Sequence, residues 1–305
     1  MKRSLGVILF LLLFIGGCGS SSSESSDDKL QIYTTVYPLQ FFIQEIGGEF
    51  IESETVYPAG VDAHTYEPTA KIMTKLAEAD AFIYIHPEYE AFAAQAEKAL
   101  KNQEVKIFSI HSREELFDNE THANEEDGHN HGEFDPHIWL DPIRAKELVE
   151  VLKDELVTLD PEHKDFFEER TEKLKGELDQ IHQEFVDLLS TKQELKILVS
   201  HAGYGYWESR YGIEMIAVQG VSTSDEPSQK ELEQIINKAQ KNDMEYLIFE
   251  QNIQSNVSDI LQSELGLKAL TIHNLEVLTE QDHKDEEDYF SIMRKNLKVL
   301  QKALK

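Results

Sequence analysis

Eight short β-rich segments alternate with helical segments along the chain, and this alternation restricts the fold more than any other feature. The β-rich segments form two groups of four: 30–36, 52–58, 81–86 and 105–110, then 195–201, 213–219, 245–250 and 267–273. Helical spacing occurs between them at 38–47, 69–78, 89–101, 203–211, 228–241 and 255–265. Such alternation is typical of parallel sheets with crossover helices. We therefore predict an α/β fold with two similar lobes, each a mostly parallel four-stranded sheet with flanking helices.

One long helix is predicted between the two groups. Asp160 and Pro161 are suited to an N-cap and a first-turn proline. Apolar residues then follow on one narrow face, namely Phe167, Leu174, Leu178, Ile181, Phe185 and Leu188. A helix over 161–190 would be about 45 Å long and suits a rigid connector between the lobes. The alternative is a coiled-coil dimer helix, but fewer than four clean heptads are present, so we expect a monomer.

The amino-terminal residues have the pattern of an export signal. Lys2 and Arg3 precede an apolar run over 5–15, and the stretch "IGGC" that follows resembles a bacterial lipobox ending at Cys18. We predict a signal peptide over 1–17, a lipid on Cys18 that anchors the protein to the outer face of the cell membrane, and a flexible tether over 18–28. An ordinary signal peptide that includes a Cys is the alternative. The predicted lobes are 29–159 and 192–305, with the linking helix at 160–191.

The charge of the chain is strongly negative. Fifty-eight acidic residues stand against 29 Lys and Arg, which gives a formal net charge of −29. Such a field repels nucleic acid and anionic lipid surfaces and concentrates cations nearby. We therefore expect no nucleic-acid partner, and the charge is consistent with a cation-related role or with solubility alone.

Four potential metal ligands lie at the ends of predicted strands or in constrained loops. His64 follows the second strand, His137 lies between two Asp-Pro pairs that we expect to form turns, His201 ends a strand, and Glu276 follows the last strand. Open parallel sheets bind ligands at the carboxyl ends of their strands. Three imidazoles and one carboxylate suit Zn²⁺, whereas Mn²⁺ favours more oxygen ligands and Ca²⁺ or Mg²⁺ would not recruit three histidines.

Several stretches resemble a known family. They are "YPLQFFIQEIGGEF", "VYPAGVDAHTYEPT", "DPHIWLDP", "VSHAGYGYW" and "LQSELGLKALTIHNLEVLT". Together they resemble the metal-binding lipoproteins of bacterial zinc/manganese ABC importers, and specifically the zinc branch. The resemblance extends over about residues 30–300.

The resemblance implies a site and a function. It places metal ligands at His64, His137 and His201, where the third histidine favours zinc over manganese, and a fourth at Glu276, which water replaces in some zinc relatives. Glu67 and Glu250 are further carboxylates nearby. The family's fold is two α/β lobes joined by one long helix, with the metal in the cleft between them. The implied function is capture of extracytoplasmic Zn²⁺ for a permease and its ATPase, without covalent chemistry, so the protein is not expected to be an enzyme.

An acidic segment over 112–135 carries three more histidines, His122, His129 and His131. Its composition predicts a mobile loop. In the resembling family a His-rich loop here is thought to gather metal near the cleft. The alternative is a solvated insertion without a role.

Two other functions stay open. The first is a manganese-binding relative or surface adhesin with the same fold. The second is an exported zinc hydrolase, which would need an open metal position and a general base; the sequence contains no His-Glu-x-x-His motif.

Overall fold

The computed structural model describes residues 29–87, 89–117 and 135–305. The predicted signal peptide, Cys18 and the tether lie outside the described residues, as do His122, His129 and His131 of the acidic segment. The two ends of that segment, however, are folded. A short 3₁₀ helix, η3 (Glu114–Leu116), buries Leu116, and Asp135 is also buried. The expectation of a mobile loop over all of 112–135 is therefore wrong at both ends.

Each predicted strand of the first half is present, and each is shorter than predicted. The elements in order are β1 (Leu30–Thr34), α1 (Tyr37–Gly47), η1 (Gly48–Phe50), β2 (Ile51–Thr55), α2 (Ala70–Glu78), β3 (Ala81–Tyr84), α3 (Ala91–Leu100), β4 (Lys106–Ser109) and η2 (Ile110–Ser112). A proline opens α1, and the Thr69 hydroxyl caps α2 by accepting from the backbone N–H of Ile72. These local signals explain why both helices begin where the sequence predicts.

The second half repeats the alternation of strands and helices. Its elements are β5 (Lys196–Val199), α6 (Gly205–Tyr211), β6 (Glu214–Ala217), α7 (Gln229–Lys241), β7 (Tyr246–Glu250), α8 (Asn256–Leu265), β8 (Lys268–Ile272), α9 (Glu280–Lys284) and α10 (Tyr289–Ala303). Ser228 and Glu231 form a capping box at the start of α7. The predicted helices of this half are all present.

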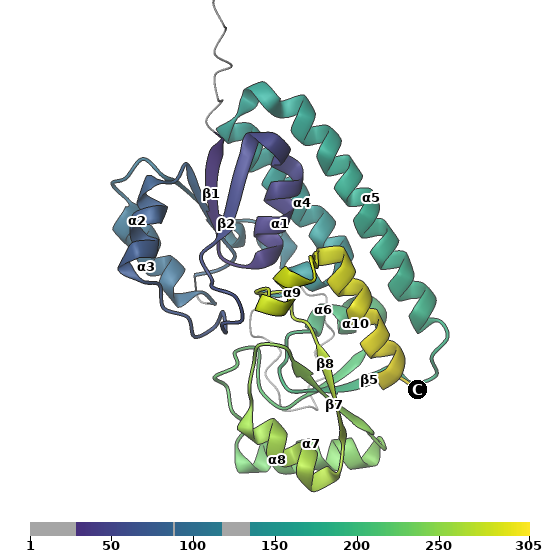
Figure 1. The fold of residues 1–305 in the computed structure, drawn as a ribbon. Helices are drawn as coiled ribbons and strands as arrows, with labels where there is room; N and C mark the ends of the chain where they lie inside the picture. Colours follow the sequence, from purple (N-terminus) through teal and green to yellow (C-terminus); the bar gives the residue numbers. More distant parts are fainter. Residues whose placement is uncertain (1–28, 88, 118–134) are drawn as a thin grey trace, which may run out of the picture.

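The two sheets have the same topology. The strand orders are β2-β1-β3-β4 and β6-β5-β7-β8, and every pair is parallel. In each half the second strand pairs with one side of the first strand, and the third and fourth strands lie on its other side. Ligands bind at such switch points, beyond the carboxyl ends of the strands. The α/β prediction is confirmed, and Figure 1 shows the two sheets stacked along one side of a long helix.

That helix, α5 (Lys164–Leu189), differs from the prediction at both ends. A 3₁₀ turn, η5 (Pro161–His163), precedes it, and Asp160 makes no capping bond because its carboxylate pairs with the ring of His163. Near the other end Leu189 is buried while Leu188 is only partly buried. The helix has 26 residues, or about 39 Å.

Two substantial helices, α4 (Pro142–Leu159) and α10, lie outside the helices predicted from the sequence. Helix α5 packs against α1 and α4 of the first half and against α10 of the second. Rings of α1 and α10 also touch directly, since Phe41 stacks on Tyr289 with 5.9 Å between centroids. The two halves are therefore joined by side-chain packing as well as by the covalent connector.

The apolar core is continuous between the halves. One cluster extends from the first sheet through α4 and α5 to α10, and a smaller one lies between the second sheet and helices α7 and α8. In the described part of the chain, none of the helices combines the length and apolar character needed to cross a membrane.

Candidate metal site

His64 lies in the loop between β2 and α2. Its backbone N–H donates to the Asp62 carboxylate at 2.9 Å, which folds a local turn and fixes the start of the side chain. Two residues of the second half form hydrogen bonds with this loop. Asn252 donates to the carbonyl of Val61 at 2.8 Å, and Thr223 donates to Asp62 at 3.0 Å. The His64 side chain is only 3% exposed.

His137 is oriented by the acidic residue two positions before it. The same oxygen of Asp135 accepts from the His137 backbone N–H at 3.0 Å and contacts ring Nδ1 at 2.8 Å. Ring Nε2 is thereby directed toward Glu276, whose Oε1 lies 3.2 Å away. The second Asp-Pro pair has a different role from the predicted turn, because Asp141 caps α4 by accepting from the N–H of Ile143.

His201 follows β5 and is held by a carboxylate at the end of β7. Its Nδ1 lies 3.1 Å from Glu250, which also accepts from the Tyr204 hydroxyl at 2.7 Å. Its Nε2 lies 2.7 Å from the carbonyl of Val221. A Cβ at Gly203 would come within 3.0 Å of the His201 ring, so only glycine fits beside it without displacement.

Glu276 supplies the carboxylate from the chain after β8. It is fully buried, and its two oxygens have different donors. Oε1 accepts from the Tyr89 hydroxyl at 2.6 Å, and Oε2 accepts from the Asn274 amide at 3.1 Å. Leu275 between Asn274 and Glu276 has a φ of 62°, a left-handed conformation that a Leu seldom adopts.

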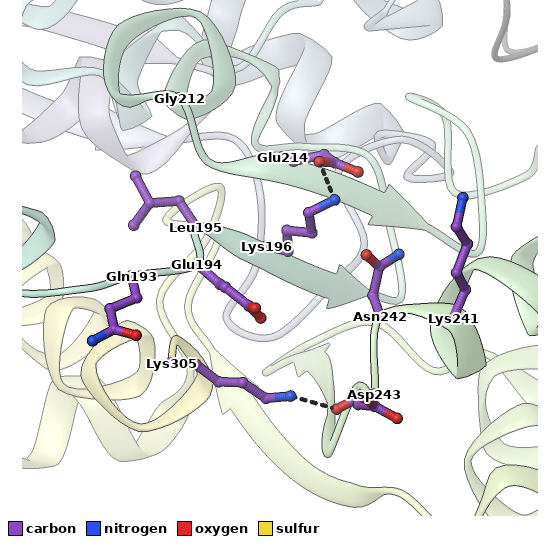
Figure 2. Close-up of a pocket in the computed structure, with 10 residues that line it drawn as sticks. All are labelled: Gln193, Glu194, Leu195, Lys196, Gly212, Glu214, Lys241, Asn242, Asp243 and Lys305. Atoms are coloured by element: carbon purple, nitrogen blue, oxygen red, sulfur yellow. Dashed lines mark hydrogen bonds and ion pairs between the residues drawn. The ribbon is translucent and has the colours of Figure 1, made fainter.

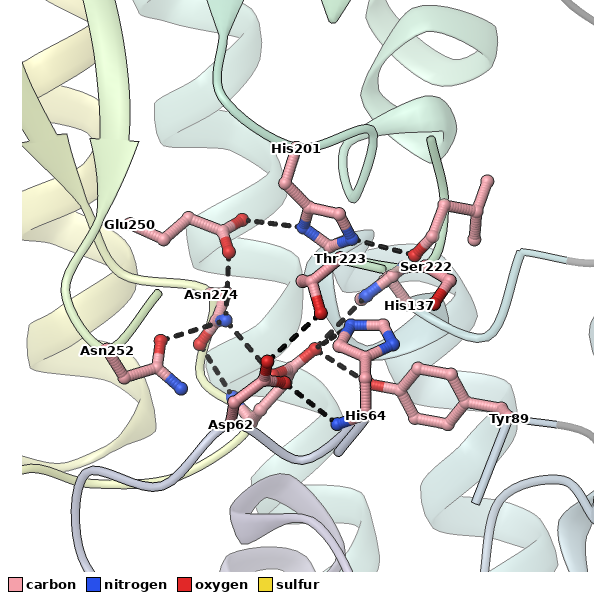
Figure 3. A network of polar contacts seen from close by, with 12 residues as sticks. Asp62, His64, Tyr89, His137, His201, Ser222, Thr223, Glu250, Asn252 and Asn274 are labelled. Atoms are coloured by element: carbon pink, nitrogen blue, oxygen red, sulfur yellow. Dashed lines mark hydrogen bonds and ion pairs between the residues drawn. The ribbon is translucent and has the colours of Figure 1, made fainter. Parts of the chain in front are cut away.

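His64, His137 and His201 converge on one small volume (Figure 3), and Glu276 lies beside two of them. The rings of His64 and His137 both lie 5.1 Å from that of His201, and their Nε2 atoms are each 3.2 Å from Glu276 Oε1. Tetrahedral zinc bonds of about 2.0–2.1 Å put neighbouring ligand atoms roughly 3.3 Å apart. Among the described residues, the buried Nε2 of His64 makes no hydrogen bond of suitable geometry, although it lies close to this oxygen. The spacing of these atoms fits a zinc ion.

In this site, the attraction between imidazoles and neighbouring carboxylates changes the pKa values more than burial does. Burial lowers the pKa of His137, but Asp135 and Glu276 raise it to about 10. Burial likewise lowers the pKa of His201, yet Glu250 brings it above its usual value. Burial raises the pKa of Glu276, but the two imidazoles beside it hold that pKa well below the usual value. Protons therefore compete with a metal cation for the ring nitrogens.

Comparison with known proteins assigns the family. Residues 32–303 match the family described as "Zinc-uptake complex component A periplasmic". The chain belongs to this family. A zinc-binding lipoprotein of the family, AdcA from Streptococcus pneumoniae, is 33% identical over 99% of this chain, and the chain spans 61% of the length of that relative. The high-affinity zinc uptake protein ZnuA of Bacillus subtilis is 28% identical, with 98% of this chain and 97% of that protein covered.

A solved structure of the same family has the same architecture. The Zn(II)-bound ZnuA-like domain of Streptococcus pneumoniae AdcA superimposes with a TM-score of 0.72 at 32% identity, covering 90% of this chain and 98% of that one. The two-lobed α/β fold implied by the family resemblance is therefore confirmed.

The structure brings the predicted ligands His64, His137 and His201 together and places Glu276 beside the first two. Glu67 is exposed and does not join them. Glu250 lies behind His201 and orients its ring. Tyr89 and Asn274, both in contact with Glu276, were not expected from the sequence. The one local signal for such supporting groups was an acid or amide two residues before a ligand, as at Asp135 and Asn274.

A separate hollow of about 650 Å³ lies at the opposite edge of the second sheet (Figure 2). Its wall includes Lys196 and Glu214, the first residues of β5 and β6, which form an ion pair at 2.6 Å, and Lys305, which donates to the carbonyl of Asp243. The predicted ligands follow the carboxyl ends of the strands, so this hollow is not part of the candidate metal site.

Replacing Tyr89 by Phe should weaken zinc binding about tenfold, because loss of one hydrogen bond to a ligand typically costs ten- to a hundredfold in affinity. The Tyr89 hydroxyl holds Oε1 of Glu276, and the ring contacts of Tyr89 survive the change. Competition with a chelator of known affinity measures the effect. Tyr246→Phe, whose ring contacts Lys268 and Lys302 far from the site, is the matched control. Equal affinities for both variants would contradict a role for the hydroxyl.

Proposed function

We propose that this protein is the zinc-binding component of an ABC-type zinc importer. It captures Zn²⁺ between its two halves and delivers the ion to a membrane permease with its ATPase. The observation that carries the proposal is the cluster of three imidazoles from both halves of the chain, with Oε1 of Glu276 3.2 Å from two of them. The zinc-related names of its relatives support the same cargo.

In this proposal His64, His137 and His201 bind the ion through ring nitrogens, and Glu276 binds it through Oε1. Nε2 of His201 then exchanges its contact with the Val221 carbonyl for the ion. Four protein ligands occupy all positions of a tetrahedral zinc ion and leave none for a reacting water. The protein therefore acts by binding and release and not as an enzyme. Release is aided by the protons that compete for the same nitrogens.

The proposal extends to the placement of the protein at the cell surface. A lipid on Cys18 anchors a monomer to the outer face of the membrane, and residues 18–28 tether it. The first lobe is 29–159, the linking segment 160–191 and the second lobe 192–305. His122, His129 and His131 gather zinc for the buried site. Support comes from the sequence pattern and from the lipoprotein named among the relatives.

Titration of the metal-free protein with Zn²⁺ and separately with Mn²⁺ tests the cargo. We expect one tight zinc site per chain, and X-ray absorption at the zinc edge should indicate about three nitrogen ligands and one oxygen ligand. Tighter binding of Mn²⁺ than of Zn²⁺ would favour a manganese-binding relative. Zinc-dependent hydrolysis that disappears in a ligand variant would favour an enzyme.

Zinc binding should release protons at neutral pH. The pKa of His137 is raised to about 10, so this imidazole carries a proton below that pH and must lose it to bind the ion. Affinity should therefore fall as pH decreases from about 9 to 6. Calorimetry at one pH in buffers of different ionisation enthalpy measures the protons released, and His137 should contribute about one. Binding heats that do not depend on the buffer would contradict this expectation.

A further inference from the structure

Acidic side chains surround the three histidines more densely than a zinc ion requires. They are Asp62, Asp135, Glu250 and Glu276, and all but Asp62 are buried. Zn²⁺ is stable with four ligands, whereas Mn²⁺ favours about six ligands that are mostly oxygen. The number of carboxylate oxygens free to bind therefore decides which ion the site prefers.

Two of these carboxylates contact the Nδ1 atoms of histidine rings. Asp135 Oδ1 holds the backbone and Nδ1 of His137. Glu250 Oε1 contacts Nδ1 of His201, and its Oε2 accepts from the Asn274 amide at 3.1 Å. Both groups contact the imidazole through Nδ1 and so orient the ring, as supporting carboxylates do in metal sites.

Asp62 is close enough to act as a ligand but both its oxygens are engaged. Together with His64 and Glu276 it forms a second group whose potential ligand atoms lie within 4.8 Å of one another. Its Oδ1 accepts from the His64 N–H at 2.9 Å, and its Oδ2 accepts from the Thr223 hydroxyl at 3.0 Å. Thr223 reaches this loop from the second half, as Figure 3 shows.

Glu276 offers one oxygen for a related reason. The Asn274 amide holds Oε2, while Oε1, which accepts from the Tyr89 hydroxyl, faces Nε2 of His64 and of His137 at 3.2 Å. Asn274 is fully buried and is itself fixed, because its side-chain oxygen accepts from the Glu276 N–H at 3.1 Å and its backbone carbonyl accepts from the Trp139 indole at 2.9 Å. A carboxylate held in this way coordinates through one oxygen and not through two.

We propose that Asn274 and Thr223 determine the metal specificity of the site by fixing the orientation of Glu276 and Asp62, so that Glu276 presents only Oε1 to the histidines and Asp62 stays turned toward Thr223. The ion then meets three nitrogens and one oxygen, which suits Zn²⁺ and leaves a six-coordinate ion such as Mn²⁺ short of oxygen ligands. This inference rests on the proposed zinc-binding function. It assigns the selectivity to two uncharged residues that do not themselves touch the ion.

Thr223→Val is the decisive variant, because Val has nearly the same shape but no hydroxyl. Titration of the metal-free full chain with Zn²⁺ alone and with Mn²⁺ alone gives the ratio of the two affinities. We expect this ratio to fall about tenfold, with Mn²⁺ bound more tightly than by the wild type. X-ray absorption of the zinc-bound variant should indicate an additional oxygen ligand. Thr223→Ser keeps the hydroxyl and should retain the wild-type ratio.

Thr158→Val is the matched control, since Thr158 is exposed on α4 and its hydroxyl donates to the carbonyl of Asp154. Asn274→Leu should shift the ratio in the same direction as Thr223→Val. If that buried change prevents folding, the Thr223 pair decides the question alone. A ratio and a coordination number unchanged in Thr223→Val overturn the inference, as does an equal loss of both affinities. Failure of the proposed function looks different, because the wild type would then not bind zinc tightly at all.

Discussion

Replacing His137 by Ala should lower the affinity for Zn²⁺ more than about a hundredfold. Loss of a group that merely supports a ligand typically costs ten- to a hundredfold, so loss of a ligand itself should exceed that range. His137 is fully buried in the site, between Asp135 and Glu276. Competition with chelators of graded affinity measures the change.

The matched control for this prediction is His283→Ala, which removes an exposed histidine from α9 and should leave zinc affinity unchanged. The metal-free His137 variant should also unfold at lower denaturant concentration, because Asp135 and Glu276 stay buried without this imidazole. Near-normal zinc affinity in a folded His137→Ala protein would remove this residue from the site.

Replacing Trp207 by Ala should lower the free energy of unfolding by about 3–5 kcal/mol, the usual cost of removing a large buried aromatic side chain. Trp207 on α6 is fully buried, contacts Phe185 of α5 at 5.3 Å between centroids, and donates to the carbonyl of Leu140 at 2.7 Å. The change would leave a cavity between the two halves and an unpaired buried carbonyl.

Urea unfolding of the metal-free protein measures this loss. Ile260→Ala on α8 is the control, because Ile260 is 56% exposed and surface changes usually stay within about 0.5 kcal/mol. A loss below about 1 kcal/mol for Trp207→Ala would mean that the halves are held together chiefly by the α5 connector.

The two helices that escaped prediction show where local patterns can mislead. Helix α4 has clear signals, since Asp141 caps it, Pro142 opens it, and Leu148, Leu152 and Leu156 share its buried face. The prediction of a turn at each Asp-Pro pair missed this helix, because the same dipeptide also begins helices. Helix α10 likewise starts with a capping box at Asp288 and buries Met293.

The sequence by itself determined the strands and the parallel α/β class, and it predicted the four candidate ligands. Strand-forming runs are local, and an imidazole keeps its chemistry wherever the fold places it. Only the tertiary structure decided which groups support the ligands. Tyr89 and Glu276 are 187 residues apart, and Asp62 meets Thr223 across 161 residues. No short pattern records such contacts, because packing of the two halves creates them. That packing also decided that Glu250 orients a ring and that Glu67 lies at the surface.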